Sequence, residues 1–260
     1  MEQIWIPVVL VGAIGLLLGI GLAVAAVVLA VPVDEKVTKI REALPGANCG
    51  ACGYSGCDGY AEAVAAGKAE ANRCVPGGAE TAATVAEIAG VAAGEFVAKQ
   101  AFVLCRGNCD NTKPKYTYNG LQSCAAAALI FQGPGACNYG CIGMGDCVRV
   151  CEYDAIRVVD GLARVNPAKC SGCGKCANAC PKSIIKIMPT QVPSVVRCVN
   201  RDKGASTRKV CSAGCIGCKL CEKKCPVGAV SVTNNVAAID PDKCTGCGAC
   251  SDACPQKCIN

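Results

Sequence analysis

Closely spaced cysteines are the residues of this chain that could do chemistry. The stretch CIGCKLCEKKCP begins at Cys215, and CTGCGACSDACP repeats its spacing from Cys244. Three thiolates spaced CxxCxxC can wrap one [4Fe-4S] cluster, while the cysteine before proline binds the other cluster of a two-cluster unit. The spacing predicts two crossed clusters, one held by Cys215, Cys218, Cys221 and Cys254 and the other by Cys244, Cys247, Cys250 and Cys225.

An earlier part of the chain carries a second copy of this pattern. Nine cysteines between Cys124 and Cys180 recur 74 residues later, which indicates an internal duplication. Glu152 stands where the second copy has Pro226, but the spacing is otherwise kept. The first copy therefore predicts a cluster held by Cys151, Cys170, Cys173 and Cys176.

One column of the first copy differs. Met144 stands where the second copy has Cys218. Methionine is a poor ligand for a cluster iron, so either another thiolate completes the site or one iron is absent. We predict that Cys137 completes it, although its counterpart Cys211 lies in a copy that already has all its ligands. The other thiolates of this set are Cys141, Cys147 and Cys180.

The region before the duplication contains a fifth cysteine group, spaced CxxCx4Cx16C. It predicts a separate [4Fe-4S] cluster held by Cys49, Cys52, Cys57 and Cys74. Each remaining cysteine is individually more typical of a buried thiol. Together they could hold a sixth cluster, and the connector with Cys105, Cys109 and Cys124 is the place to look; the others are Cys198, Cys211 and Cys258.

The elements that must position these cysteines can be read from the stretches between them. Residues 58–73 have helical composition, and residues 79–104 predict one or two alanine-rich helices. Residues 105–123 are polar and predict a connector. Residues 158–170 and 232–244 each predict two short strands joined by a two-residue turn.

Composition limits the alternatives. The chain has 260 residues, 26 cysteines and no histidine, which excludes histidine-containing zinc sites, Rieske centres and histidine acid/base catalysis. Zinc modules made of cysteine alone remain a rival, but they have no use for the third cysteine or the crossed fourth. Nothing resembles a substrate pocket, a nucleophile with its base or a phosphate-binding loop, so the expected chemistry is one-electron transfer.

The net charge of +6 is unevenly distributed. Eight basic residues fall between Arg197 and Lys224. They could form a solvated loop face, or they could steer an acidic protein partner toward the chain. We predict that Arg197, Arg201 and Lys203 contact such a partner. A nucleic-acid partner is not expected, because aromatic stacking platforms are missing from the sequence.

Residues 3–33 contain no charged side chain, and this run exceeds the roughly 20 residues that cross a bilayer as a helix. A cleaved signal peptide is the competing interpretation, but the run is longer than a signal core and follows Glu2 rather than a basic residue. Lys36, Lys39 and Arg41 follow the run, so residues 34–260 are expected in the cytoplasm. Disulfides are improbable in that reducing compartment.

The order of these motifs resembles the B-subunit family of the Rnf complex, a membrane-bound ferredoxin:NAD oxidoreductase that pumps ions. The resemblance rests on an apolar N-terminal segment, LPGANCGACGYSGC with Cys74, YNGLQSC, and GACNYGCIGMGDCVRVC followed by a ferredoxin repeat. It implies a protein that takes electrons from soluble acidic ferredoxin, relays them through its [4Fe-4S] clusters, of which the spacing predicts five, and assembles with other Rnf membrane subunits. A ferredoxin-type adaptor of another membrane-bound reductase is the alternative.

The expected fold class is α+β, with one transmembrane helix, a small helical cluster module and tandem bacterial-type two-cluster ferredoxin folds. The predicted domains are an anchor (1–33), a cluster module (34–80), a helical segment with a connector (81–123) and two ferredoxin repeats (124–190 and 191–260).

Overall fold

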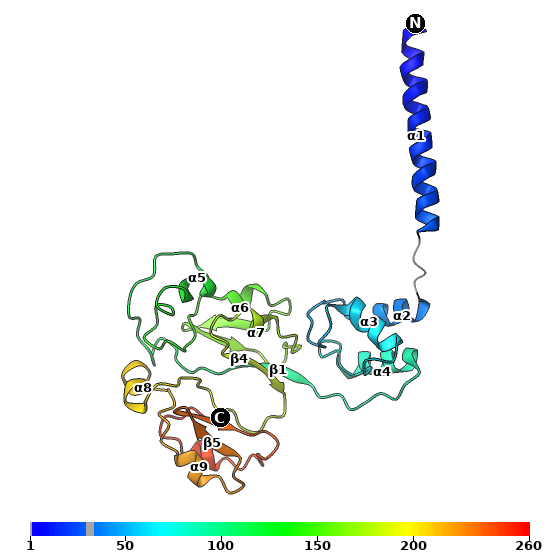
Figure 1. The fold of residues 1–260 in the computed structure, drawn as a ribbon. Coiled ribbons are helices and arrows are strands. Elements are labelled where there is room, and N and C mark those ends of the chain that lie inside the picture. The colour runs from blue at the N-terminus through cyan, green and yellow to red at the C-terminus, as the bar shows by residue number, and fades with distance from the viewer. Residues whose placement is uncertain (1, 30–33) are drawn as a thin grey trace.

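The computed structural model describes residues 2–29 and 34–260, and it arranges them as a series of small units (Figure 1). The first is a single long helix, α1 (Glu2–Val28). Its segment Val8–Val28 has a mean hydropathy of 2.7 and is not buried by the rest of the chain. By length and composition α1 is a candidate membrane span. The end of the predicted anchor, residues 30–33, lies outside the described residues.

The second unit, which we call the helical module (residues 34–98), packs three helices around a small core. They are α2 (Glu35–Ala43), α3 (Cys57–Ala65) and α4 (Gly78–Ala89). The helices meet through Ile40, Tyr60 and Val85, which are almost fully buried. The helix predicted across residues 58–73 forms only in its first half.

Local interactions explain where α2 begins, where α4 ends and how the loop after α3 is held. The Asp34 carboxylate accepts a hydrogen bond from the Lys36 amide (2.8 Å) and so begins α2. Gly90 adopts a left-handed conformation with φ 73° and ends α4. The Tyr60 hydroxyl donates to the Glu70 carbonyl (2.7 Å) and accepts from the Arg73 amide (3.2 Å). Tyr60 thereby fixes the loop that leads to Cys74.

The predicted helical stretch 79–104 is helical only as far as Ala89. Its end forms a strand, β1 (Lys99–Val103), which pairs antiparallel with β4 (Ile185–Pro189). Ala101 and Val103 alternate with more exposed neighbours and are buried against the first repeat. Pairing with β4 therefore overrides helix propensity here, and this part of the segment belongs to the unit that follows.

The next two units are structural copies, which we call the first repeat (residues 99–190) and the second repeat (residues 195–260). Each contains a two-stranded hairpin, as predicted. Both central residues of each turn have positive φ, at Asp160-Gly161 and at Asn234-Asn235, as the tight turn of a twisted hairpin requires. The strands are β2 (Ile156–Val159) and β3 (Leu162–Val165), then β5 (Val230–Thr233) and β6 (Val236–Ile239).

Short helices follow the cysteine motifs at matching places in the two repeats. The first repeat has α6 (Asp146–Arg149) and α7 (Lys175–Asn178), and the second has α9 (Leu220–Lys224) and α10 (Ala249–Asp252). The 74-residue period seen in the cysteines thus extends to the backbone. The second repeat also carries α8 (Gly204–Val210).

Each repeat also opens with an extended segment that pairs with its own C-terminal end. In the first repeat Val103 lies opposite Ile185, and in the second Val196 forms an isolated bridge with Ile259. Ile185 and Ile259 are 74 residues apart, but Val103 and Val196 are not. The first repeat therefore carries extra chain between its opening segment and its first cysteine motif.

This extra chain holds α5 (Cys124–Ala128), which Asp146 joins to α6. The Asp146 carboxylate accepts hydrogen bonds from the Cys124 amide (3.0 Å), the Ala125 amide (2.9 Å) and the Ser123 hydroxyl (3.0 Å), and it pairs with Arg149. Burial alone would raise the pKa of Asp146, but these partners hold it below its ordinary value. Its side chain is only 13% exposed.

We expect Asp146→Asn to lower the free energy of unfolding by about 1.5–3 kcal/mol at pH 7, because it weakens several hydrogen bonds to a charged acceptor. A depressed carboxyl pKa contributes stability above the unfolded-state value of roughly 4, and this contribution is lost as the pH falls through the folded-state pKa. Thermal unfolding followed by circular dichroism measures the difference. Asp58→Asn is the control, because Asp58 forms an exposed ion pair with Arg41; an equal effect in both variants contradicts the expectation.

Candidate metal centres

Two cavities are each enclosed by four of the cysteines that spacing predicts to act together. The cavity of the second repeat has a volume of about 330 Å³ and is lined by Cys215, Cys218, Cys221 and Cys254, with Cys258 as a fifth cysteine. One cavity of the first repeat has a volume of about 350 Å³ and is lined by Cys151, Cys170, Cys173 and Cys176. In both cases the crossed cysteine comes from the other motif of the same repeat.

In two further cysteine sets, the thiols lie close enough to shift the pKa of one member. Burial raises the pKa of Cys74, and the nearby thiols of Cys57, Cys49 and Cys52 raise it further. Burial likewise raises the pKa of Cys250, with additional contributions from Cys244 and Cys225. Cys247, the remaining member of the second set, has an exposed side chain.

The site with the missing cysteine has a different fourth thiol from the one predicted. Its cavity, of about 370 Å³, is lined by Cys141, Cys147 and Cys180 together with Cys124. Cys137 does not line this cavity but a separate one. The structure therefore does not bring the predicted ligand Cys137 together with this set. It brings Cys124 there, from the chain that is extra in the first repeat.

The position of Cys124 follows from how α5 begins. The Ser123 side chain caps α5 by accepting from the Ala126 amide, and Asp146 binds the first amides of the helix. Asp146 precedes Cys147 directly, so the same carboxylate holds Cys124 beside a member of the cysteine set. The sequence signal was the pair Ser123-Cys124 ahead of an alanine run, but nothing in its spacing points to Met144.

The surroundings of these cysteines suit sulfur ligands that carry negative charge. The Ala155 amide donates to the Cys151 sulfur (3.4 Å), and the equivalent Ala229 amide donates to the Cys225 sulfur (3.2 Å). The Ala101 amide of β1 donates to the Cys170 sulfur (3.4 Å). Amide hydrogen bonds to cluster sulfurs are one of the ways in which proteins set cluster potentials. These residues therefore fit [4Fe-4S] clusters.

Burial also determines the protonation of the thiols before metal binds. It raises the pKa of Cys147 to about 12 and that of Cys176 and Cys221 to about 11. Such thiols are neutral near pH 7, and metal ligation requires thiolates, so loading these sites releases protons.

The sulfurs enclose volumes rather than converging on single points. Within residues 2–29 and 34–260, no group of three or more histidine, cysteine or acidic side chains comes close enough to hold one metal ion. A zinc ion needs its sulfurs about 2.3 Å from one centre. Three cysteines of one motif with a crossed fourth from the other motif fit a multi-iron cluster better than a lone zinc ion.

The helical module contacts the first repeat near these sites. A methyl group on Gly172, in the loop between Cys170 and Cys173, would lie 2.4 Å from the Lys99 carbonyl and 2.9 Å from the Val75 side chain. The pKa of Lys175 is raised, mainly by its hydrogen bond to Glu152 and further by the thiols of Cys173 and Cys49. The module site therefore lies beside the Cys151–Cys176 site.

The three predicted docking residues occupy different environments. Arg201 and Lys203 are exposed. Arg197 is half-buried, and its Nε donates to the Val103 carbonyl (2.7 Å). Since this guanidinium is engaged inside the protein, we leave Arg197 out of any docking surface.

Comparisons with known proteins agree with this picture. An Fe-S cluster family model matches residues 44–76, and a 4Fe-4S dicluster domain model matches residues 137–184, 169–229 and 214–258. The chain is 48% identical over its whole length to the B subunit of the Na(+)-translocating ferredoxin:NAD(+) oxidoreductase complex of Acetobacterium woodii, covering 78% of that protein. It is 38% identical over 96% of its length to the B subunit of the ion-translocating oxidoreductase complex of Methanosarcina acetivorans, covering 98% of that protein.

We expect Cys124→Ala to remove the cluster at Cys141, Cys147 and Cys180 or to convert it to a three-iron form, since three thiolates remain. Iron analysis and EPR of anaerobically purified protein measure this. Adding Met144→Cys to the variant should restore the four-iron site, because Met144 occupies the column of Cys218. Cys109→Ala is the control, because Cys109 is exposed. Unchanged iron content in Cys124→Ala contradicts the assignment.

Proposed function

Because this chain belongs to the B-subunit family of ion-translocating ferredoxin:NAD(+) oxidoreductase complexes, we propose that it receives electrons from a reduced ferredoxin and relays them toward the membrane subunits of such a complex. When bound, [4Fe-4S] clusters supply one-electron transfer. The observation that carries the proposal is the set of cysteine groups in the helical module and in both repeats, with the module group beside the site of Cys173.

The chain's own residues serve this role by holding clusters in a fixed order and at different exposures. Five sites follow from the cysteine sets described above, with Cys124 as the fourth ligand of the set that contains Cys141. In the second repeat Cys218 and Cys247 have exposed side chains, whereas Met144 and Cys173 at the equivalent positions of the first repeat are half-buried. The second repeat is therefore the better place for electrons from a soluble donor to enter.

The opposite end of the series is suited to the membrane. The helical module directly follows α1, and only residues 30–33 lie between the described part of α1 and the polar segment at Asp34. Lys36, Lys39 and Arg41 on α2 favour a cytoplasmic position for residues 34–260. The module would then face the membrane subunits.

A basic surface on the second repeat suits an acidic donor. Arg201, Lys203, Arg208 and Lys209 lie on and just before α8, and all four are exposed. Lys219 is exposed beside Cys218, so positive charge also lies next to a cluster ligand. Ferredoxins of acidic composition would be steered to this surface at low ionic strength.

We expect the double charge reversal Arg201→Glu/Lys203→Glu to slow reduction of the protein by ferredoxin by roughly tenfold or more at low salt, because steering changes association rates over about 10–1000-fold. The difference should shrink as salt is added. Stopped-flow absorbance in the cluster bands measures the rate, and reduction by dithionite should be unchanged.

The matched control is Lys39→Glu/Lys68→Glu, which reverses two exposed charges on the helical module. It should leave the rate within about twofold of wild type, since it lies away from the proposed docking surface. Equal slowing by both variants would indicate a general charge effect and would reject the docking surface.

A further inference from the structure

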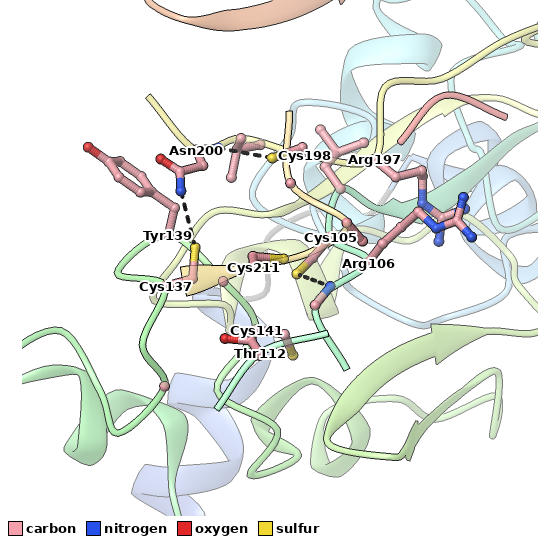
Figure 2. Close-up of a pocket in the computed structure, with 17 residues that line it drawn as sticks. Cys105, Arg106, Thr112, Cys137, Tyr139, Cys141, Arg197, Cys198, Asn200 and Cys211 are labelled. Carbon is pink, nitrogen blue, oxygen red and sulfur yellow. Dashed lines mark hydrogen bonds between the residues drawn. The ribbon is translucent and has the colours of Figure 1, made fainter. Parts of the chain in front are cut away.

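One cavity is lined by Cys141 and by four cysteines that neither the crossed motifs nor the helical module uses. Its volume is about 450 Å³, larger than that of the three cavities described above. Cys105, Cys137, Cys198 and Cys211 line it from four separate stretches of the chain (Figure 2). Cys105 and Cys211 are buried, and the other two are half-buried.

These four cysteines form two equivalent pairs, one from each repeat. Cys137 and Cys211 are related by the 74-residue period. Cys105 and Cys198 each lie two residues after the residue that pairs with the C-terminal end of its repeat, Val103 opposite Ile185 and Val196 opposite Ile259. The structural counterpart of Cys198 is therefore Cys105, although the sequence period aligns Cys198 with Cys124. Each repeat therefore contributes two equivalent cysteine sulfurs to this one cavity.

The local geometry of the pairs matches as well. The Gly107 amide donates to the Cys105 sulfur (3.4 Å), and the Asn200 amide donates to the Cys198 sulfur (3.5 Å), each from two residues further along the chain. A methyl group on Gly107 would lie 3.5 Å from the Cys211 sulfur and 3.6 Å from the Cys105 sulfur. These two sulfurs, from different repeats, therefore face the same turn.

A buried amide side chain adds a further donor to the cavity. Asn200 is 1% exposed, and its Nδ2 donates to the Cys137 sulfur (3.5 Å), as Figure 2 shows. Its Oδ1 accepts from the Asp202 amide (2.7 Å), which orients the amide so that its NH₂ group points toward sulfur. Placing N–H donors against a sulfur suits a negatively charged thiolate ligand better than a neutral thiol.

Positive charge also collects here without an acidic partner. Arg106 and Arg197 both line the cavity. Burial lowers the pKa of Arg197, and the neighbouring charges of Arg106 and Arg164 lower it further. In the described part of the chain no salt bridge involves these arginines. A four-thiolate cluster carries net negative charge and would offset this repulsion.

We propose that Cys105, Cys137, Cys198 and Cys211 bind a sixth [4Fe-4S] cluster at the junction of the two repeats. The site lies between two of the others: Cys141 lines both this cavity and that of Cys124, and the Cys215 amide donates to the Cys198 sulfur (3.3 Å). The two dicluster repeats would thus be joined by a cluster that belongs to neither. The proposal goes beyond the relay function and does not depend on the identity of the electron donor.

Native mass spectrometry of the anaerobically purified full-length protein in detergent tests the site. Wild type should carry six clusters, roughly 24 irons with matching sulfide. Cys105→Ala/Cys211→Ala should lose the mass of one cluster, because it removes one ligand from each repeat. The control Cys109→Ala should keep all six, since Cys109 is exposed and lies outside the cavity.

A second measurement keeps the proposal testable even if the double variant does not fold. Alkylation of native wild-type protein should label Cys109 alone, because every other thiol would be a cluster ligand except Cys258, which is 1% exposed. Five clusters in wild type, five clusters with one zinc ion, or labelling of the four junction cysteines each overturns the proposal. Retention of six clusters in Cys105→Ala/Cys211→Ala overturns it too. None of these measurements involves ferredoxin, so they do not depend on the relay function.

Discussion

The architecture of the soluble part depends on one requirement: small groups of sulfurs must be held around cavities by a chain with few large apolar side chains. Only 4% of the residues are aromatic, and cysteines make up a large share of the buried residues in both repeats. Hairpins as short as β2–β3 and β5–β6 are marginal by themselves in water. Metal ligation can contribute much of the folding free energy of small domains, and here it would replace part of a conventional core.

The duplication produced two copies of this cysteine arrangement, and they differ at one ligand position and in the length of one segment. Met144 removes a sulfur from the first repeat, and the chain between Cys105 and Cys137 is longer than that between Cys198 and Cys211. The added segment carries Cys124 into the incomplete cavity through α5 and Asp146. An insertion and a lost ligand therefore compensate each other within one repeat.

Much of this arrangement could be predicted from the sequence, because the strand, turn and cysteine-spacing signals each lie within a short stretch of chain. The hairpins followed from strand pattern and turn residues, and the crossed cysteine sets followed from spacing. The fourth thiol of the cavity near Met144 could not be predicted from the sequence, because Cys124 reaches this cavity through a contact between α5 and α6 that leaves no periodic signal. Strand β1 was missed for a similar reason, since its pairing with β4 spans most of the first repeat. Arg197 was counted as surface charge because its hydrogen bond to Val103 cannot be read from composition.

The junction cavity also bears on the order in which the protein matures. The other cysteine sets each close within the helical module or within one repeat, so their sites can be completed as soon as that stretch has been synthesised. The set of Cys105, Cys137, Cys198 and Cys211 cannot, because two of its members precede the second repeat and two belong to it. A cluster there could be completed only once residues of both repeats have come together around the cavity.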